Sequence, residues 1–191
     1  ESPDRRPGLV QQVICWFVYS AFYVCLMSPC WFRLQASTTA ETTTVVVSWL
    51  TTITGLGLQV VGLLTESVAD LQKSLFKQQS RQHRLEWCRV GLWRFSTHPN
   101  YAGEWLFWLG TLLAGLPFYS SLYQLALSLV GLSFLTLVLT GASTKLSEKQ
   151  TINYGPPYLD FCEYHGAFGP KFWKRKRPKE AKQATKSDEL L

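Results

Sequence analysis

The chain has 191 residues, which is enough for one domain with a sizeable core, and carries a formal net charge of +6 at pH 7. Its mean hydropathy of +0.01 averages long uncharged blocks with basic blocks, so an ordinary soluble composition is excluded. The five cysteines form no CxxC pair and no His/Cys metal spacing, and this pattern argues against a metal site or a disulfide framework.

Two membrane spans are predicted in the first third of the chain, after a polar lead-in at residues 1–8. Residues 10–32 and residues 45–65 contain no charged side chain. A helix of about 20 apolar residues crosses the hydrocarbon core of a bilayer. Residues 65–79 contain no Gly or Pro, so the second helix is expected to continue beyond the membrane.

Two more spans are predicted at residues 102–117 and 120–142. The first of these is shorter and contains Glu104 near its start. The sequence therefore predicts an all-α integral membrane protein with about four transmembrane helices. Residues 9–170 form its single membrane domain, and residues 171–191 form a basic tail.

The distribution of cations predicts the orientation. Of the 19 Lys and Arg residues, two precede the first span, six lie between the second and third, and ten follow the fourth. The positive-inside rule places both termini and the central loop on one side, the matrix, stromal or cytosolic side. An organellar inner membrane is favoured, with the endoplasmic reticulum as the alternative.

A charged stripe emerges from the second span. Glu66, Asp70, Lys73 and Lys77 recur at steps of four, three and four, which places them on one helical face. Ion pairing on a solvated helix end explains this spacing, and a row of ligand contacts at the membrane surface is the alternative. In the same helix, "GLGLQVVG" has the wrong spacing for a dinucleotide fingerprint and predicts close helix packing.

The segment "LWRFSTHPNYAGEWLFWLG", residues 92–110, places polar side chains directly before an apolar run. Thr97 or His98 is the expected cap, with Pro99 at the first helical position, where a missing N–H costs nothing. The helix N-terminus favours an anion such as a phosphate, and Arg94 is close enough in sequence to assist. Ordinary helix electrostatics also accounts for Glu104, although a carboxylate at a span entrance commonly points at a cavity or partner.

Three segments, in order, resemble the steroid 5-alpha reductase-like superfamily: "ESVADLQK", "GLWRFSTHPNYAGEWLFWLG" and "TGASTKLSEKQTINYGPPYLDFCEYHGAFGPKFW". The likeness covers residues 55–173 and is greatest to a branch of membrane proteins with AD-x-QK and HPNY-x-GE motifs. It implies an N-terminally shortened, steroid-reductase-like helical bundle that binds NADPH and reduces a C=C bond of a sterol or other lipid. The implied cofactor-binding residues are Asp70, Gln72, Lys73, Arg94, His98, Asn100, Tyr101, Glu104, Glu148 and Tyr154, of which Glu104 and Tyr101 are also the implied catalytic residues.

Two departures from that superfamily favour alternatives. Only one span precedes the AD-x-QK helix, and it contains no acid; Thr97 stands where the superfamily most often has Arg or Lys. A non-catalytic accessory subunit of an organellar membrane complex is therefore one alternative, without a cofactor or with a lipid or nucleotide in the pocket. A second alternative is an S-adenosylmethionine-dependent methyltransferase, because the chain also resembles the related isoprenylcysteine carboxyl methyltransferases.

The basic tail predicts the partners. A polybasic segment such as residues 171–191 usually lies against anionic headgroups or an acidic partner subunit. Membrane lipids and subunits of a larger membrane complex are therefore expected partners. Nothing in the chain resembles a nucleic-acid-reading motif, so no nucleic acid is expected.

Overall fold

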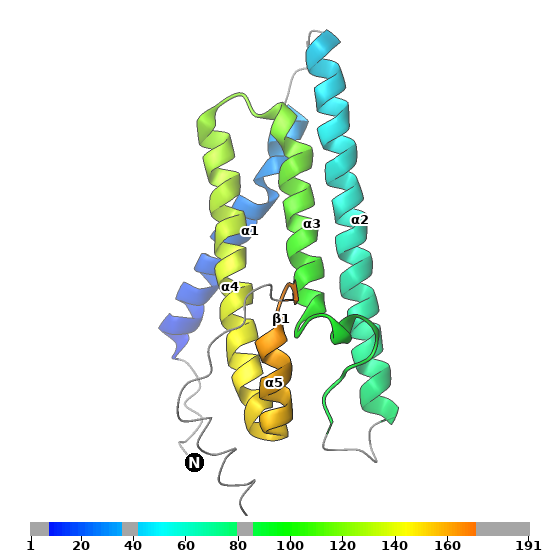
Figure 1. The fold of residues 1–191 in the computed structure, drawn as a ribbon. Coiled ribbons are helices and arrows are strands. Elements are labelled where there is room, and N and C mark those ends of the chain that lie inside the picture. The colour runs from blue at the N-terminus through cyan, green and yellow to red at the C-terminus, as the bar shows by residue number, and fades with distance from the viewer. Residues whose placement is uncertain (1–7, 36–41, 80–85, 171–191) are drawn as a thin grey trace, which may run out of the picture.

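A computed structural model describes residues 8–35, 42–79 and 86–170 of the chain. Its elements are α1 (Leu9–Gln35), α2 (Thr42–Gln79), α3 (Pro99–Gly115), α4 (Leu122–Tyr154) and α5 (Pro156–Tyr164), with short 3₁₀ helices η1 (Gly91–Arg94) and η2 (Leu116–Phe118) and strands β1 (His165–Gly166) and β2 (Gly169–Pro170). In Figure 1, α2, α3 and α4 run nearly side by side, and α1 runs at a slant behind α4 and α3.

Within the described residues, three helices are long and apolar enough to cross a membrane: α1, most of α2 and α4. The chain is thus an α-helical membrane protein, with one antiparallel pair of two-residue strands that the sequence did not predict. The predicted continuation of the second span as helix is confirmed as far as Gln79. Helix α4 extends beyond the predicted fourth span, residues 120–142, to Tyr154, where Gly155 turns the chain with a φ of 70°.

Helices α2 and α3 are antiparallel and touch through glycines. A Cβ atom on Gly55 would lie 2.6 Å from the Gly110 carbonyl oxygen, and the Gly62–Gly103 pair is equally close. Small residues let helix backbones approach in membranes, where apolar surface alone does not drive association. The Gln59 side-chain amide also donates to Thr111 Oγ1 at 2.9 Å. The close packing predicted for the glycine-rich segment is therefore present.

The apolar core lies between α1, α3 and α4. Phe22 and Leu26 of α1 pack against Leu135 and Leu139 of α4, and the aromatic rings of α3 cover this cluster. The indole of Trp105 donates to Thr136 Oγ1 at 2.9 Å and so ties α3 to α4. These contacts hold the bundle in one register, with the first turn of α3 beside the emerging part of α2.

At one end of the bundle, α5 and the two strands return to the start of α3. The Thr97 backbone N–H donates to the Gly166 carbonyl oxygen at 3.0 Å. The Ser96 hydroxyl donates to the same carbonyl at 3.2 Å. The segment after α4 therefore packs on the residues that precede α3.

Candidate functional site

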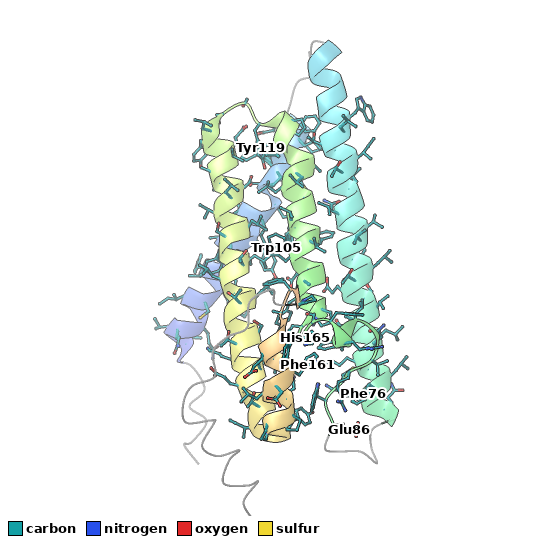
Figure 2. All side chains as sticks on the ribbon, in the orientation of Figure 1. Phe76, Glu86, Trp105, Tyr119, Phe161 and His165 are labelled. Atoms are coloured by element: carbon teal, nitrogen blue, oxygen red, sulfur yellow. The ribbon has the colours of Figure 1, made fainter. Side chains whose placement is uncertain are left out.

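A cavity of about 360 Å³ lies at this end of the bundle, between the end of α2, the connector at residues 86–98, the end of α4 and α5. Figure 2 labels Phe76 and Glu86 on the α2 side and Phe161 on the α5 side. Its volume falls in the range of about 300–1,000 Å³ that small-molecule pockets occupy. The lining residues are Lys73, Phe76, Lys77, Glu86, Trp87, Cys88, Trp93, Ser96, Thr97, Leu146, Lys149, Gln150, Asn153, Tyr154, Tyr158 and Phe161.

Two hydrogen bonds from η1 to α2 position the connector. The Leu92 backbone N–H donates to the Gln72 side-chain oxygen at 2.9 Å, and the Trp93 indole donates to the Ala69 carbonyl at 2.9 Å. Gly91 has a φ of 56°, and any Cβ there would collide with the Gln72 amide. The side chain of Gln72, predicted to contact a cofactor, is thus used to hold η1 in place.

Cationic side chains enter the cavity wall from two helices. Lys73 and Lys77 come from α2 and Lys149 comes from α4. The Lys73 ammonium lies 4.5 Å from the centre of the Trp93 ring, in cation–π geometry. The charged stripe of α2 therefore divides, because its two lysines line the cavity and its two carboxylates do not.

Aromatic side chains also line the cavity. The Trp87 ring lies 5.4 Å from Tyr158 and 6.2 Å from Phe161, centre to centre. The Arg89 guanidinium covers the Trp87 ring at 4.6 Å. Burial raises the pKa of the Tyr158 phenol and of the Cys88 thiol, so both side chains are neutral at pH 7. The cavity thus combines aromatic rings with ammonium groups, of which those of Lys77 and Lys149 belong to exposed residues.

His98 is the N-cap residue of α3, and Pro99 occupies the first turn. The imidazole is buried, stacks on Tyr101 at 5.2 Å and contacts Thr97 Oγ1 through Nδ1 at 3.1 Å. Burial, assisted by the positive charge of Lys73, lowers the pKa of His98 to about 4. The ring is therefore neutral at physiological pH, and within the described part of the chain its Nε2 has no hydrogen-bond partner.

The remaining polar residues of α3 lie just beyond the cavity. Asn100 Oδ1 is buried and, among the described residues, has no hydrogen-bond partner. Glu104 is half-buried, and its carboxylate is close enough to Glu66 of α2 for the two to repel. Tyr101 packs against the apolar core. These groups line the interface between α2, α3 and α4 at the level where α2 becomes charged.

Of the ten residues predicted to bind a cofactor, Lys73 and Tyr154 line the cavity. Gln72 holds η1 in place, His98 is buried next to the lining residue Thr97, and Asp70, Arg94 and Glu148 are exposed. Sequence reasoning missed several lining residues, because their side chains meet only after the connector folds back over α2 and α5 folds back along α4. These residues are Trp87, Lys149, Gln150, Asn153, Tyr158 and Phe161.

The fold and the cavity define a helical membrane protein with a cavity of small-molecule size at one end of its bundle. The chain matches the family model "Protein of unknown function (DUF1295)" over residues 6–166 and belongs to that family. No curated protein and no solved structure matches the chain.

Proposed function

We propose that this protein is a membrane-embedded, NADPH-dependent reductase of the steroid 5-alpha reductase-like type, acting on a C=C bond of a sterol or other lipid. The observation that carries the proposal is the cavity beside Lys73, which is lined by ammonium groups from two helices and by aromatic rings. Ammonium groups bind phosphates, and aromatic rings stack on flat heterocycles. A dinucleotide combines these two chemistries.

The chemistry of the cavity fits this cofactor. Lys73, Lys77 and Lys149 are the groups that would hold its phosphates, and the partly exposed rings of Phe76 and Trp87 would offer surfaces for its bases. The indole Nε1 of Trp87 is a buried hydrogen-bond donor that has no partner among the described residues, so it is available to a ligand. When bound, NADPH supplies the hydride, and the protein contributes binding, orientation and electrostatics.

The same proposal includes a four-span topology with α3 as the third span. This helix has 17 residues, and η2 extends it by three. The glycine contacts, one heptad apart on each helix, align it with the apolar part of α2. The cavity then lies on the positive side of the membrane, where the distribution of cations predicts both termini and the connector. An organellar inner membrane is the proposed location.

One observation favours a second candidate, a non-catalytic accessory subunit. Neither Tyr101 nor Glu104, the residues implied as catalytic, lines the cavity. A chain that keeps the pocket but has lost the reaction would bind a nucleotide or lipid and act as part of a complex with neighbouring subunits. The basic tail at residues 171–191, outside the described residues, would be the segment that docks on those subunits.

Binding of NADPH to the detergent-purified protein tests the proposal through the change in nicotinamide fluorescence. We expect saturable binding, with NADH and S-adenosylmethionine as weaker competitors. Lys149→Ala should weaken binding, whereas Lys145→Ala, one turn away on α4 and outside the cavity lining, should not. Equal effects of the two variants, or tighter binding of S-adenosylmethionine, would reject the NADPH site.

A further inference from the structure

The outward face of α2 carries an apolar stripe that does not stop where the charges begin. Leu64, Val68, Leu71 and Leu75 follow one another at steps of four, three and four, so they lie on one face of the helix. Val68 is 41% exposed, Leu71 58% and Leu75 47%. On the membrane-spanning part of the helix the stripe continues through further exposed residues, namely Leu50, Ile53, Val60 and Val61.

This stripe is longer than the hydrocarbon core. At about 1.5 Å per residue, the distance from Leu50 to Leu75 along α2 is about 38 Å. The hydrocarbon core is about 30 Å thick, and the whole bilayer with its headgroup regions is about 40–45 Å thick. If Leu50 lies at one edge of the hydrocarbon core, Leu75 therefore lies among the headgroups on the other side of the bilayer.

The charged stripe of α2 lies on the other side of the helix. Its positions are offset by two residues from the apolar ones, a rotation of about 200°. Lys73 and Lys77 face the cavity, and Ala69 and Gln72 hold η1. The helix beyond the span is thus amphipathic, with the cavity on its polar side and an apolar side that no described element covers.

The connector adds a second apolar and cationic surface at the same depth. The hydrogen bond from Leu92 to Gln72 places η1 beside the part of α2 that continues beyond the span. Val90 is 52% exposed and Phe95 58% exposed. Arg89 and Arg94, beside them in the sequence, are exposed as well. Exposed apolar side chains alternating with cations are typical of segments that lie on an anionic membrane surface.

The opposite side of the bundle differs at this level. Lys145 and Glu148 are exposed on α4 beside the exposed Ile152, so charged side chains occupy that face at a level where the exposed stripe of α2 is still apolar. Lys149 and Lys73 line the same cavity, so the two helices are compared at equal depth. The contrast indicates a bundle whose α2 side lies deeper in the membrane than its α4 side.

We infer that the phospholipid bilayer covers the outer face of α2 as far as Leu75 and reaches the connector at Phe95, so that the cavity lies at the depth of the lipid headgroups. Continuity with the lipid-facing part of the same helix favours lipid over a partner protein as the occupant of this face. The cavity is thereby placed within reach of amphipathic molecules that stay in the membrane. This inference is independent of the identity of the cofactor.

Photo-crosslinking of the full chain tests this placement. The photoreactive amino acid p-benzoylphenylalanine replaces Leu71 or Leu75 in separate variants, and the protein is reconstituted in vesicles of equal parts phosphatidylcholine and phosphatidylglycerol. Val60, exposed in the middle of the apolar part of α2, provides the positive control. Asp70, on the opposite face, and Lys145, on α4, provide the negative controls. Mass spectrometry then identifies covalent lipid adducts.

We expect the lipid adduct yield at positions 71 and 75 to approach that at position 60 and to exceed that at positions 70 and 145 several-fold. Adducts at position 60 without adducts at 71 and 75 would show that the bilayer ends before this face. The same crosslinks in native membranes provide a further test, because a protein adduct at 71 or 75 in place of a lipid adduct would overturn the inference. Retained NADPH binding or an unchanged elution volume shows that each variant is folded.

Discussion

Gly62 of α2 and Gly103 of α3 face each other so closely that neither position has room for a Cβ atom. A Cβ built on either glycine would lie 2.6 Å from the carbonyl oxygen of the other. This contact fixes where α3 begins relative to α2 and brings Glu104 beside Glu66. It also places the connector, and with it the cavity, just beyond the apolar part of the bundle.

Replacing Gly62 with alanine should destabilise the protein by about 1–3 kcal/mol, the usual cost of overpacking. A methyl group there meets backbone atoms of α3, which do not move aside easily. Gly57→Ala is the matched control, because a Cβ at Gly57 has nothing within 4 Å. The unfolding temperatures of the two detergent-purified variants measure the difference, and equal values would contradict the close α2–α3 contact.

Replacing Gln72 with leucine should loosen the connector. The variant keeps the side-chain volume but removes the acceptor for the partly buried Leu92 N–H, which should cost about 1 kcal/mol. Limited proteolysis should cut the connector faster, and NADPH binding should weaken. Gln78→Leu, at an exposed position of the same helix, serves as the control. Unchanged proteolysis would show that η1 does not depend on this bond.

The stability of the protein should fall as the pH decreases from about 6.5 to about 4. Burial, with a contribution from Lys73, lowers the pKa of His98 to about 4, whereas an imidazole in the unfolded chain titrates near 6.5. The unfolded state therefore binds the proton first, and up to about 3 kcal/mol of stability is lost over this range. Unfolding temperatures of wild type and His98→Gln across this range should show a shallower dependence in the variant. Parallel curves would exclude His98 as the cause.

Thr97→Arg should strengthen NADPH binding. Thr97 lines the cavity near Lys73, and a guanidinium there adds a charge-assisted hydrogen bond worth about 1.5–3 kcal/mol. The dissociation constant for NADPH should fall about tenfold or more. Thr97→Gln, which adds length without charge, controls for the steric effect. An equal response to both substitutions would argue against phosphates at this wall.

Glu104→Gln and Asn100→Ala separate a role of α3 in nucleotide binding from a role in packing. If these residues contact the nucleotide, both variants should lose NADPH binding and keep the unfolding temperature of the wild type. The reason is that both side chains lie at the start of α3 next to the cavity, and Asn100 Oδ1 has no partner within the described residues. Wild-type affinity in both variants would restrict the nucleotide to the cavity residues on α2, α4 and α5.

The sequence determined the helical membrane class, the unbroken α2, the start of α3 at Pro99 and the packing role of the glycine-rich segment. Uncharged length, helix-cap chemistry and the absence of helix breakers are local properties, so residues close together in the chain are enough to reveal them. Motifs also singled out Lys73 and Tyr154, which line the cavity.

Only the tertiary structure decided which polar residues meet. It brought Lys149 to the same cavity as Lys73, it placed Trp87 against Tyr158, and it used Gln72 to hold the connector. These contacts join residues from different elements, and their geometry depends on how close α2 and α3 approach and on where α5 turns at Gly155. Spacing along a chain describes the face of one helix, whereas a cavity is formed by the relative positions of several helices, which are set by packing.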